Sequence, residues 1–179
     1  MEPLDDAKFS GTKEVAEHLT IEVSNLQPWI DEFVPGAGKI NSIEQFKGGQ
    51  SNPTYKIVTE SKNLVLRRKP PGKLLPSAHA VDREYKVITA LYQTDVPVPK
   101  TYGLCENDEI AGTAFFVMDF LDGDLFWNPM IPSLSNQDRT EIYQNKNKNF
   151  SLLHGVDYKR IGLEDYGNPG NNVARNVAG

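Results

Sequence analysis

The chain has 179 residues, of which 24% are charged and 39% hydrophobic, and its formal net charge is −5 at pH 7. This composition is typical of a folded globular protein and excludes a chain that is disordered throughout. The negative charge argues against nucleic-acid binding, which requires a basic surface. The single cysteine, Cys105, excludes an intrachain disulfide and a cysteine-based metal site.

The N-terminal segment and the hydropathy of the chain indicate a cytoplasmic protein. Residues 1–18 are polar and acidic and lack the basic region and apolar run of a signal peptide. No stretch approaches the roughly 18 consecutive apolar residues of a membrane span. We therefore expect neither a membrane nor a nucleic acid as partner.

The first elements in the chain are a tail and a helix. Residues 1–19 show no clear periodicity, so we expect a flexible tail. Ser24 is a candidate N-cap for the helix that follows. Apolar side chains then recur at helical spacing, at Leu26, Ile30 and Phe33.

The rest of the pattern predicts an α+β fold with a sheet of about five strands. Short runs rich in β-branched and apolar residues predict strands, and longer amphipathic runs predict helices. The predicted strands are 39–46, 53–60, 63–69, 96–104 (as an edge strand) and 113–121, and the predicted helices are 77–93 and a second one that starts near Ser133 or Ser135. Hairpins join these strands, which indicates an antiparallel sheet.

The stretch "FKGGQSNPTYKI", residues 46–57, joins two of the predicted strands. A Gly-Gly pair between strands is first of all a hairpin signal. The alternative is a phosphate-binding loop, because residues without a Cβ let backbone N–H groups approach an anion.

A basic residue and an acidic residue further along favour the second interpretation. Arg67 lies within an apolar strand, where a cation is costly unless it meets an anion. Glu84 lies beside the apolar stripe of the following helix. We expect these two side chains to pair, the alternative being that both face solvent; Lys69, on the same strand face as Arg67, is the second candidate cation.

Together, these motifs resemble a known family. The order of "FKGGQSNPTYKI", "LVLRRKPPGKLLPSAHAVDREYKVI", "VPVPKTYGL", "FFVMDFLDGD" and "IGLEDYGNPGN" is similar to that in the aminoglycoside phosphotransferase-like branch of the kinase-like superfamily. The resemblance covers roughly residues 24–175. It is nearest to the phosphotransferase domain that is fused to, or encoded beside, certain acyl-CoA dehydrogenases.

The resemblance implies a kinase-like N-lobe at 20–118, followed at 119–179 by the hinge and the first helices of a truncated C-lobe. ATP with Mg²⁺ would be the cofactor, and Arg67, anchored by Glu84, would pair with the phosphates. The loop over the phosphates would be Gly48, Gly49, Gln50, Ser51 and Asn52, and the hinge that holds adenine through its backbone would be Met118, Asp119, Phe120 and Leu121.

The catalytic base and the metal ligands of this family have no clear match. In "LLHGVDYKRIG", Val156 stands where the family has its catalytic Asp, and Asp157 follows one residue late. "DYG" at 165–167 comes too soon after Asp157 to be the metal-binding triplet, because the family leaves roughly eighteen positions between these two aspartates. We therefore assign no catalytic or metal residue, expect both beyond this part of the domain, and interpret 149–157 as a helix end and 165–171 as a turn-rich loop.

The leading hypothesis is the ATP-binding portion of a small-molecule phosphotransferase whose acceptor is a substrate hydroxyl. For the branch associated with acyl-CoA dehydrogenases, the resemblance implies a hydroxy-acyl compound, including one carried on coenzyme A. The alternative is a non-catalytic nucleotide-binding or interaction module. A third interpretation is a structural α+β domain in which the Gly-Gly pair makes an ordinary hairpin.

Overall fold

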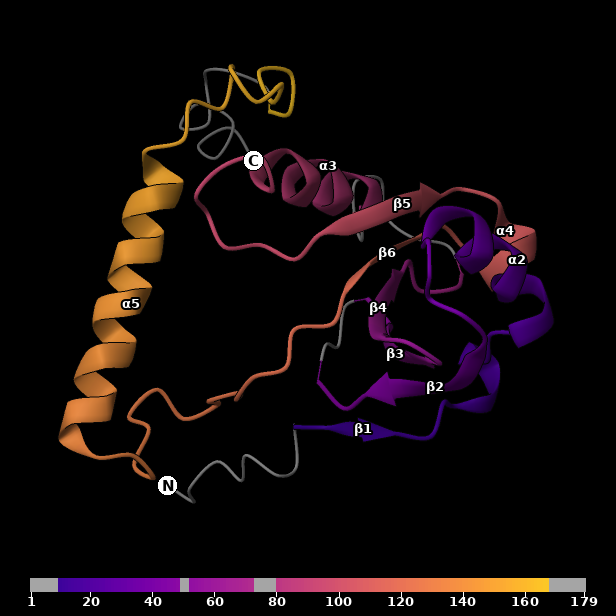
Figure 1. Cartoon of the computed structure of the whole chain (residues 1–179), viewed down its shortest axis with the longest axis horizontal. Helices are drawn as coiled ribbons and strands as arrows, with labels where there is room; N and C mark the ends of the chain where they lie inside the picture. Colours follow the sequence, from indigo (N-terminus) through magenta and orange to yellow (C-terminus); the bar gives the residue numbers. More distant parts are fainter. Residues whose placement is uncertain (1–9, 49–51, 73–79, 168–179) are drawn as a thin grey trace, which may run out of the picture.

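The computed structural model describes residues 10–48, 52–72 and 80–167. In this part of the chain, six strands form one antiparallel sheet in the order β1-β2-β3-β4-β6-β5 (Figure 1). The strands are β1 (Thr12–Lys13), β2 (Ile40–Phe46), β3 (Thr54–Thr59), β4 (Asn63–Arg68), β5 (Thr101–Cys105) and β6 (Phe115–Asp119). The helices are the 3₁₀-helix η1 (Glu17–Leu19) and the α-helices α2 (Val23–Phe33), α3 (Val81–Leu91), α4 (Asp108–Ala111) and α5 (Asn136–His154). The predicted α+β fold with an antiparallel sheet is confirmed, and β5 lies at the sheet edge as predicted.

Residues 10–19 differ from the flexible tail that we expected over 1–19, and residues 1–9 lie outside the described part of the chain. Thr12 and Lys13 pair with Phe46 and Gln45 and so add a sixth strand to the sheet. After η1, the backbone carbonyl of Leu19 accepts a hydrogen bond of 3.0 Å from the Tyr55 hydroxyl. A strand of two residues has no periodicity to detect, which is why the sequence pattern missed it.

Helix α2 covers one face of the sheet. It begins at Val23 with Glu22 at the N-cap, so the predicted N-cap at Ser24 is wrong. Trp29 stacks on Phe33 with ring centroids 4.7 Å apart and meets Phe115 of β6 edge-on at 5.1 Å. The lack of a side chain at Gly103 makes room for this cluster, because a Cβ there would lie 3.0 Å from Trp29.

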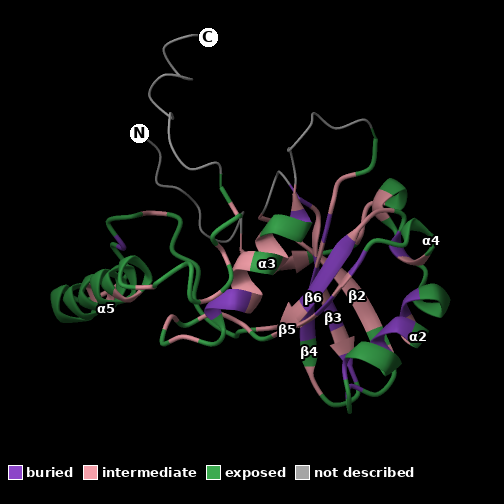
Figure 2. Ribbon diagram, turned by 90° about the horizontal axis from the view of Figure 1, so that it is seen from above, coloured by how far each residue is buried: buried purple, intermediate pink, exposed green. Residues whose placement is uncertain are grey.

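Helix α3 covers the opposite face. Its Tyr85 lies 6.0 Å from the ring of Phe116, which is the neighbour of Phe115 in β6. Because adjacent residues of a strand point to opposite faces, α2 and α3 lie on opposite sides of the sheet (Figure 2). The buried core lies mainly between α2 and the sheet, and its fully buried members include Leu26, Ile30, Tyr55, Ile57, Leu64, Leu66, Phe115 and Val117.

Arg68 is a buried cation in this core. It lies on the same face of β4 as Leu64 and Leu66 and is only 3% exposed. Its guanidinium donates to the carbonyl of Ala111 and, over 3.1 Å, to the carbonyl of Leu19. Burial lowers the pKa of Arg68, and the Tyr55 ring lies 5.3 Å from the guanidinium carbon. The charge is therefore compensated by carbonyl oxygens and an aromatic ring.

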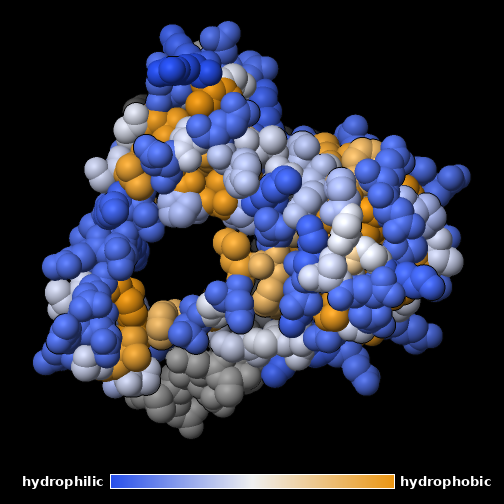
Figure 3. Space-filling model, viewed as in Figure 1, coloured by the Kyte–Doolittle hydropathy of each residue, from blue (hydrophilic) through white to orange (hydrophobic). Residues whose placement is uncertain are grey.

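Helix α5 lies apart from the sheet. It starts after Ser135, whose hydroxyl accepts a hydrogen bond of 3.2 Å from the N–H of Asp138, so Ser135 is the N-cap of the two candidates. None of its residues is buried. Figure 3 shows an open hollow between α5, the segment that leads to it and the sheet, and apolar side chains border part of it. Large exposed apolar side chains in these segments are Leu121, Leu125, Phe126, Trp127, Met130, Tyr143, Phe150 and Leu153.

The segment after α5 returns to the outer side of α3. Lys86 of α3 forms a salt bridge of 2.8 Å with Asp165. Arg83 donates a hydrogen bond of 3.0 Å to the carbonyl of Tyr166 and lies 4.5 Å above the ring of that tyrosine. Within the described residues, no helix combines the length and apolar composition needed to cross a bilayer.

The buried guanidinium leads to a stability prediction. We expect Arg68→Met to lower the free energy of unfolding by about 2 kcal/mol, because the buried carbonyl of Ala111 loses its donor and the carbonyl of Leu19 keeps only the Tyr55 hydroxyl. Lys69→Met is the matched control, since Lys69 points to the opposite face, is 34% exposed and forms a salt bridge of 3.7 Å. Urea unfolding followed by circular dichroism measures both, and equal losses in the two variants would contradict the assignment.

Candidate functional site

Arg67 and Glu84 form a bidentate ion pair between β4 and the first turn of α3. The Nε of Arg67 donates to Oε2 of Glu84, and its Nη2 donates to Oε1 over 3.3 Å. The two side chains are 28% and 35% exposed, so the pair is partly open to solvent. The predicted pairing is confirmed, and the alternative that both side chains face solvent without a partner is wrong.

Two further residues close this pair into a ring of hydrogen bonds. The Asn52 amide donates to Oε1 of Glu84 over 3.1 Å. The Thr54 hydroxyl accepts from Nη1 of Arg67 over 3.1 Å and donates to the Asn52 carbonyl over 3.0 Å. The ring therefore connects the end of the Gly-rich loop, β3, β4 and α3.

The Gly-rich loop itself lies largely outside the described residues. Gly48 is the last described residue before it, and Gly49, Gln50 and Ser51 fall outside. Asn52, which we expected to be part of the nucleotide-binding loop, is only 2% exposed and lies against Glu84.

Lys69, the second candidate cation, has its own carboxylate. Its Nζ lies 3.7 Å from Oδ1 of Asp82 on α3. Two neighbouring ion pairs, Arg67–Glu84 and Lys69–Asp82, thus join α3 to the end of β4 and the residue that follows it.

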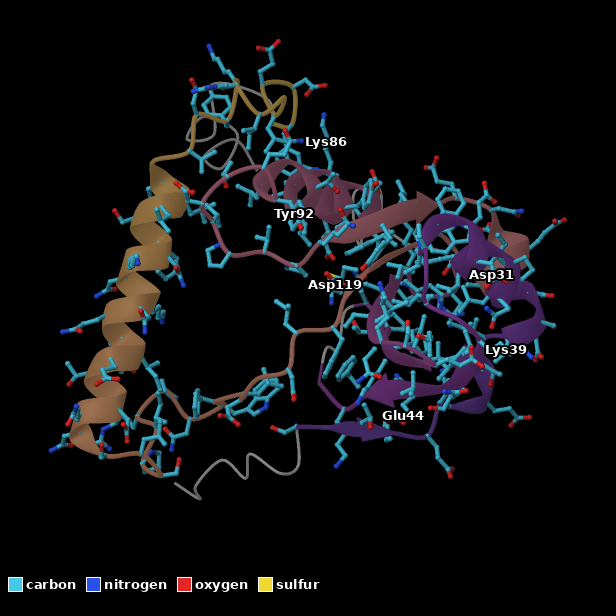
Figure 4. All side chains as sticks on the ribbon, in the orientation of Figure 1. Asp31, Lys39, Glu44, Lys86, Tyr92 and Asp119 are labelled. Carbon is cyan, nitrogen blue, oxygen red and sulfur yellow. The ribbon has the colours of Figure 1, made fainter. Side chains whose placement is uncertain are left out.

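The predicted hinge, residues 118–121, spans the end of β6 at Asp119 (Figure 4). Oδ1 of Asp119 accepts a hydrogen bond of 2.6 Å from the Tyr102 hydroxyl. Burial, together with this hydrogen bond and the charge of the carboxylate, raises the pKa of Tyr102 to about 12. The backbone N–H of Asp119 donates to the Lys100 carbonyl over 2.9 Å, and that of Phe120 donates to the Asn63 carbonyl over 3.4 Å.

The next hinge residue, Leu121, is less constrained. Its backbone N–H donates to no acceptor among the described residues, and its side chain is largely exposed. Met118, one position before Asp119, is half-buried. The hinge therefore presents a backbone donor at Leu121.

An aromatic pair that the sequence pattern did not reveal connects the hinge with the Gly-rich loop. The ring of Phe46, at the end of β2, stacks with that of Phe120 at a centroid distance of 6.3 Å and an interplanar angle of 15°. The Nζ of Lys56 lies 4.8 Å from the centroid of the Phe120 ring. The sequence feature that could have indicated this contact is Phe46 itself, an aromatic residue directly before the loop that starts at Lys47.

The two imperfect catalytic motifs are occupied by structural contacts. His154 ends α5, as predicted. Oδ1 of Asp157 accepts from the backbone N–H groups of Lys159 and Arg160, at 3.1 and 3.2 Å, and so stabilises a turn. Asp165 pairs with Lys86. In the part of the chain that the structure describes, no group of three His, Cys, Asp or Glu side chains is arranged to hold a metal ion.

The sheet, the helix glutamate and the paired strand cation define a kinase-like phosphotransferase fold. The chain belongs to the phosphotransferase enzyme family, whose model matches residues 42–179. The resemblance drawn from the sequence motifs is thereby confirmed.

Similar proteins agree with this assignment. The crystal structure of "a putative aminoglycoside phosphotransferase" from Ralstonia eutropha JMP134 superposes with a TM-score of 0.75 at 43% identity, over 89% of this chain and 46% of that one. "Probable acyl-CoA dehydrogenase IBR3" of Arabidopsis thaliana is 47% identical over 75% of this chain and 17% of its own length. "Acyl-CoA dehydrogenase family member 10" of Mus musculus is 42% identical over 93% of this chain and 16% of its own length. The chain thus spans less than a fifth of these two curated relatives and under half of the solved protein.

The Tyr102–Asp119 hydrogen bond leads to an alkaline-pH prediction. The folded protein holds the Tyr102 proton to a pKa of about 12, whereas the unfolded chain releases it near 10.0. The unfolded state therefore binds fewer protons between these values, and stability falls as pH rises through this window. We expect Tyr102→Phe to reduce the tyrosinate absorbance step near pH 12 by one tyrosine and to make this loss of stability less steep; burial also raises the pKa of Tyr55, which stays in place.

The matched control for this titration is Tyr158→Phe, because Tyr158 is largely exposed. That variant should leave the late absorbance step in place. A late step of undiminished amplitude in Tyr102→Phe would contradict the assignment.

Proposed function

We propose that this chain is the ATP-binding portion of a small-molecule phosphotransferase that transfers the γ-phosphoryl group of ATP to a substrate hydroxyl. The observation that carries the proposal is the Arg67–Glu84 pair next to the end of the Gly-rich loop. Phosphoryl-transfer enzymes of the kinase class use a strand cation held by a helix glutamate to orient ATP phosphates.

Arg67 retains donors for a phosphate while it holds its partners. A guanidinium carries five N–H groups. Glu84 accepts one hydrogen bond from Nε and one from Nη2, and Thr54 accepts one from Nη1. Each terminal nitrogen therefore keeps a second N–H that no described residue accepts. A planar pair of donors matches two phosphate oxygens, which makes Arg67 a suitable substitute for the lysine of protein kinases.

The hinge residues would bind the adenine. The N–H of Leu121 and the backbone of Asp119 would contact the ring edge, with Met118 and Phe120 beside it. The aromatic rings of Phe46 and Phe120 offer apolar faces on which a purine can stack.

Magnesium accompanies ATP in this family and neutralises charge on the transferred phosphoryl group. The described residues do not fit a magnesium site, because they contain no cluster of suitable ligands. We therefore assign no metal ligand here.

The acceptor class follows from the names of the relatives. Two of them are named as acyl-CoA dehydrogenases, so we propose a hydroxylated acyl compound, including a hydroxyacyl-CoA, as substrate. An acyl-CoA dehydrogenase, fused or encoded nearby, is the proposed partner. A cytoplasmic location stays a prediction from the sequence.

A non-catalytic nucleotide-binding module is the second candidate function. The observation that favours it is the use of Asp157 and Asp165 in structural contacts, since these are the carboxylates nearest to the family's catalytic motifs.

The nucleotide proposal is tested by calorimetric titration with Mg-ATP. We expect Arg67→Met to weaken binding at least about tenfold, because a charge-assisted contact to phosphate is lost, and Lys69→Met to change it less than about threefold. The opposite ranking would assign the phosphate contact to Lys69. A parent chain that binds no Mg-ATP would refute the proposal.

Turnover tests whether this chain carries its own catalytic base. We expect this chain alone to transfer no radioactive γ-phosphoryl group to 3-hydroxyacyl-CoA, because Asp157 and Asp165 are engaged in other contacts. Transfer above the level of a heat-denatured control would contradict this assignment and would identify a catalytic base within the chain.

A further inference from the structure

We propose that Asn52 is a positioning residue that sets the orientation of the Arg67–Glu84 pair and thereby couples the Gly-rich loop to it. The proposal rests on the proposed ATP-binding function. In it, Asn52 acts on nucleotide affinity through Glu84, without touching the nucleotide.

The side chain of Asn52 is buried against Glu84. Its amide nitrogen donates to Oε1 of Glu84 over 3.1 Å, and the residue is only 2% exposed. The same oxygen accepts from Nη2 of Arg67 over 3.3 Å. Two donors that converge on one carboxylate oxygen fix the rotation of the carboxylate, and the plane of the carboxylate fixes the plane of the bidentate guanidinium.

The backbone of Asn52 is held by Thr54 of β3. Its carbonyl accepts from the Thr54 hydroxyl over 3.0 Å, and that hydroxyl also accepts from Arg67. Residue 52 is therefore held by α3 through its side chain and by β3 through its main chain. Residue 52 and the phosphate-pairing cation are therefore connected on two sides, through Glu84 and through Thr54.

The proposal can be tested by replacing the Asn52 amide, which donates a hydrogen bond, with a carboxyl group, which donates only when it is protonated. In Asn52→Asp, a carboxyl of nearly the same shape would replace the donor next to Glu84. The charged groups around it are Glu84 on α3 and Arg67 on β4, with the Lys69–Asp82 pair next along the same two elements. Because two carboxylates at hydrogen-bond distance repel, the introduced carboxyl would take up a proton at a higher pH than an isolated aspartate and would then donate as the amide does.

The experiment measures Mg-ATP affinity as a function of pH. We expect Asn52→Asp to bind about tenfold more weakly than the parent at about pH 8 and to approach it at about pH 5.5. The double variant Asn52→Asp/Glu84→Gln exchanges the amide and the carboxylate, so it should bind more tightly at pH 8 than Asn52→Asp alone. The matched control is Asn25→Asp, whose amide donates to the Glu109 carbonyl at the exposed side of α2.

A second measurement distinguishes failure of this proposal from failure of the proposed function. The ¹⁵N resonance of the Arg67 Nε–H group reports the ion pair without any nucleotide, and in Asn52→Asp it should shift with pH, unlike in the parent. If the parent binds no Mg-ATP but this resonance responds, the ATP-binding function is wrong and the positioning role stands. If both the resonance and the affinity in Asn52→Asp match those of the parent at every pH, the positioning role is overturned.

Discussion

The bidentate pair between Arg67 and Glu84 is the contact on which the candidate site depends. Helix α3 packs against β5 and β6, and two ion pairs also join it to the end of β4. A partly exposed pair avoids the full desolvation penalty of a buried one, yet keeps guanidinium donors accessible to an anion. One interaction thus joins the helix to β4 and presents the cation.

Much of this arrangement was predictable from local patterns. The strands β2 to β6 and helix α3 follow from hydrophobic periodicity and turn residues, which depend on neighbouring positions only. The Arg67–Glu84 pair was predictable because strand alternation places Arg67 and helix geometry places Glu84 on facing surfaces. Both inferences need only the side-chain periodicity of one strand or helix and no knowledge of what packs against it.

The features that were missed depend on contacts between distant backbone groups. The acceptors of Arg68 are carbonyls 49 and 43 positions away, and a carbonyl leaves no mark in a sequence. Asp157 accepts from backbone N–H groups of a nearby turn, and Asn52, which looked like part of a phosphate loop, donates to the Glu84 side chain. Polar side chains that serve the backbone resemble functional ones until their partners are known.

The contact between Arg68 and Leu19 bears on where this unit can be cut or transplanted. A boundary at residue 20, which the sequence favoured, separates the guanidinium from one of its two carbonyl acceptors and removes the strand that pairs with β2. A truncated or chimeric protein that starts there would carry a less fully compensated charge in its core and a newly exposed sheet edge, which is a template for aggregation. The smallest portable piece of this fold therefore begins ahead of Thr12.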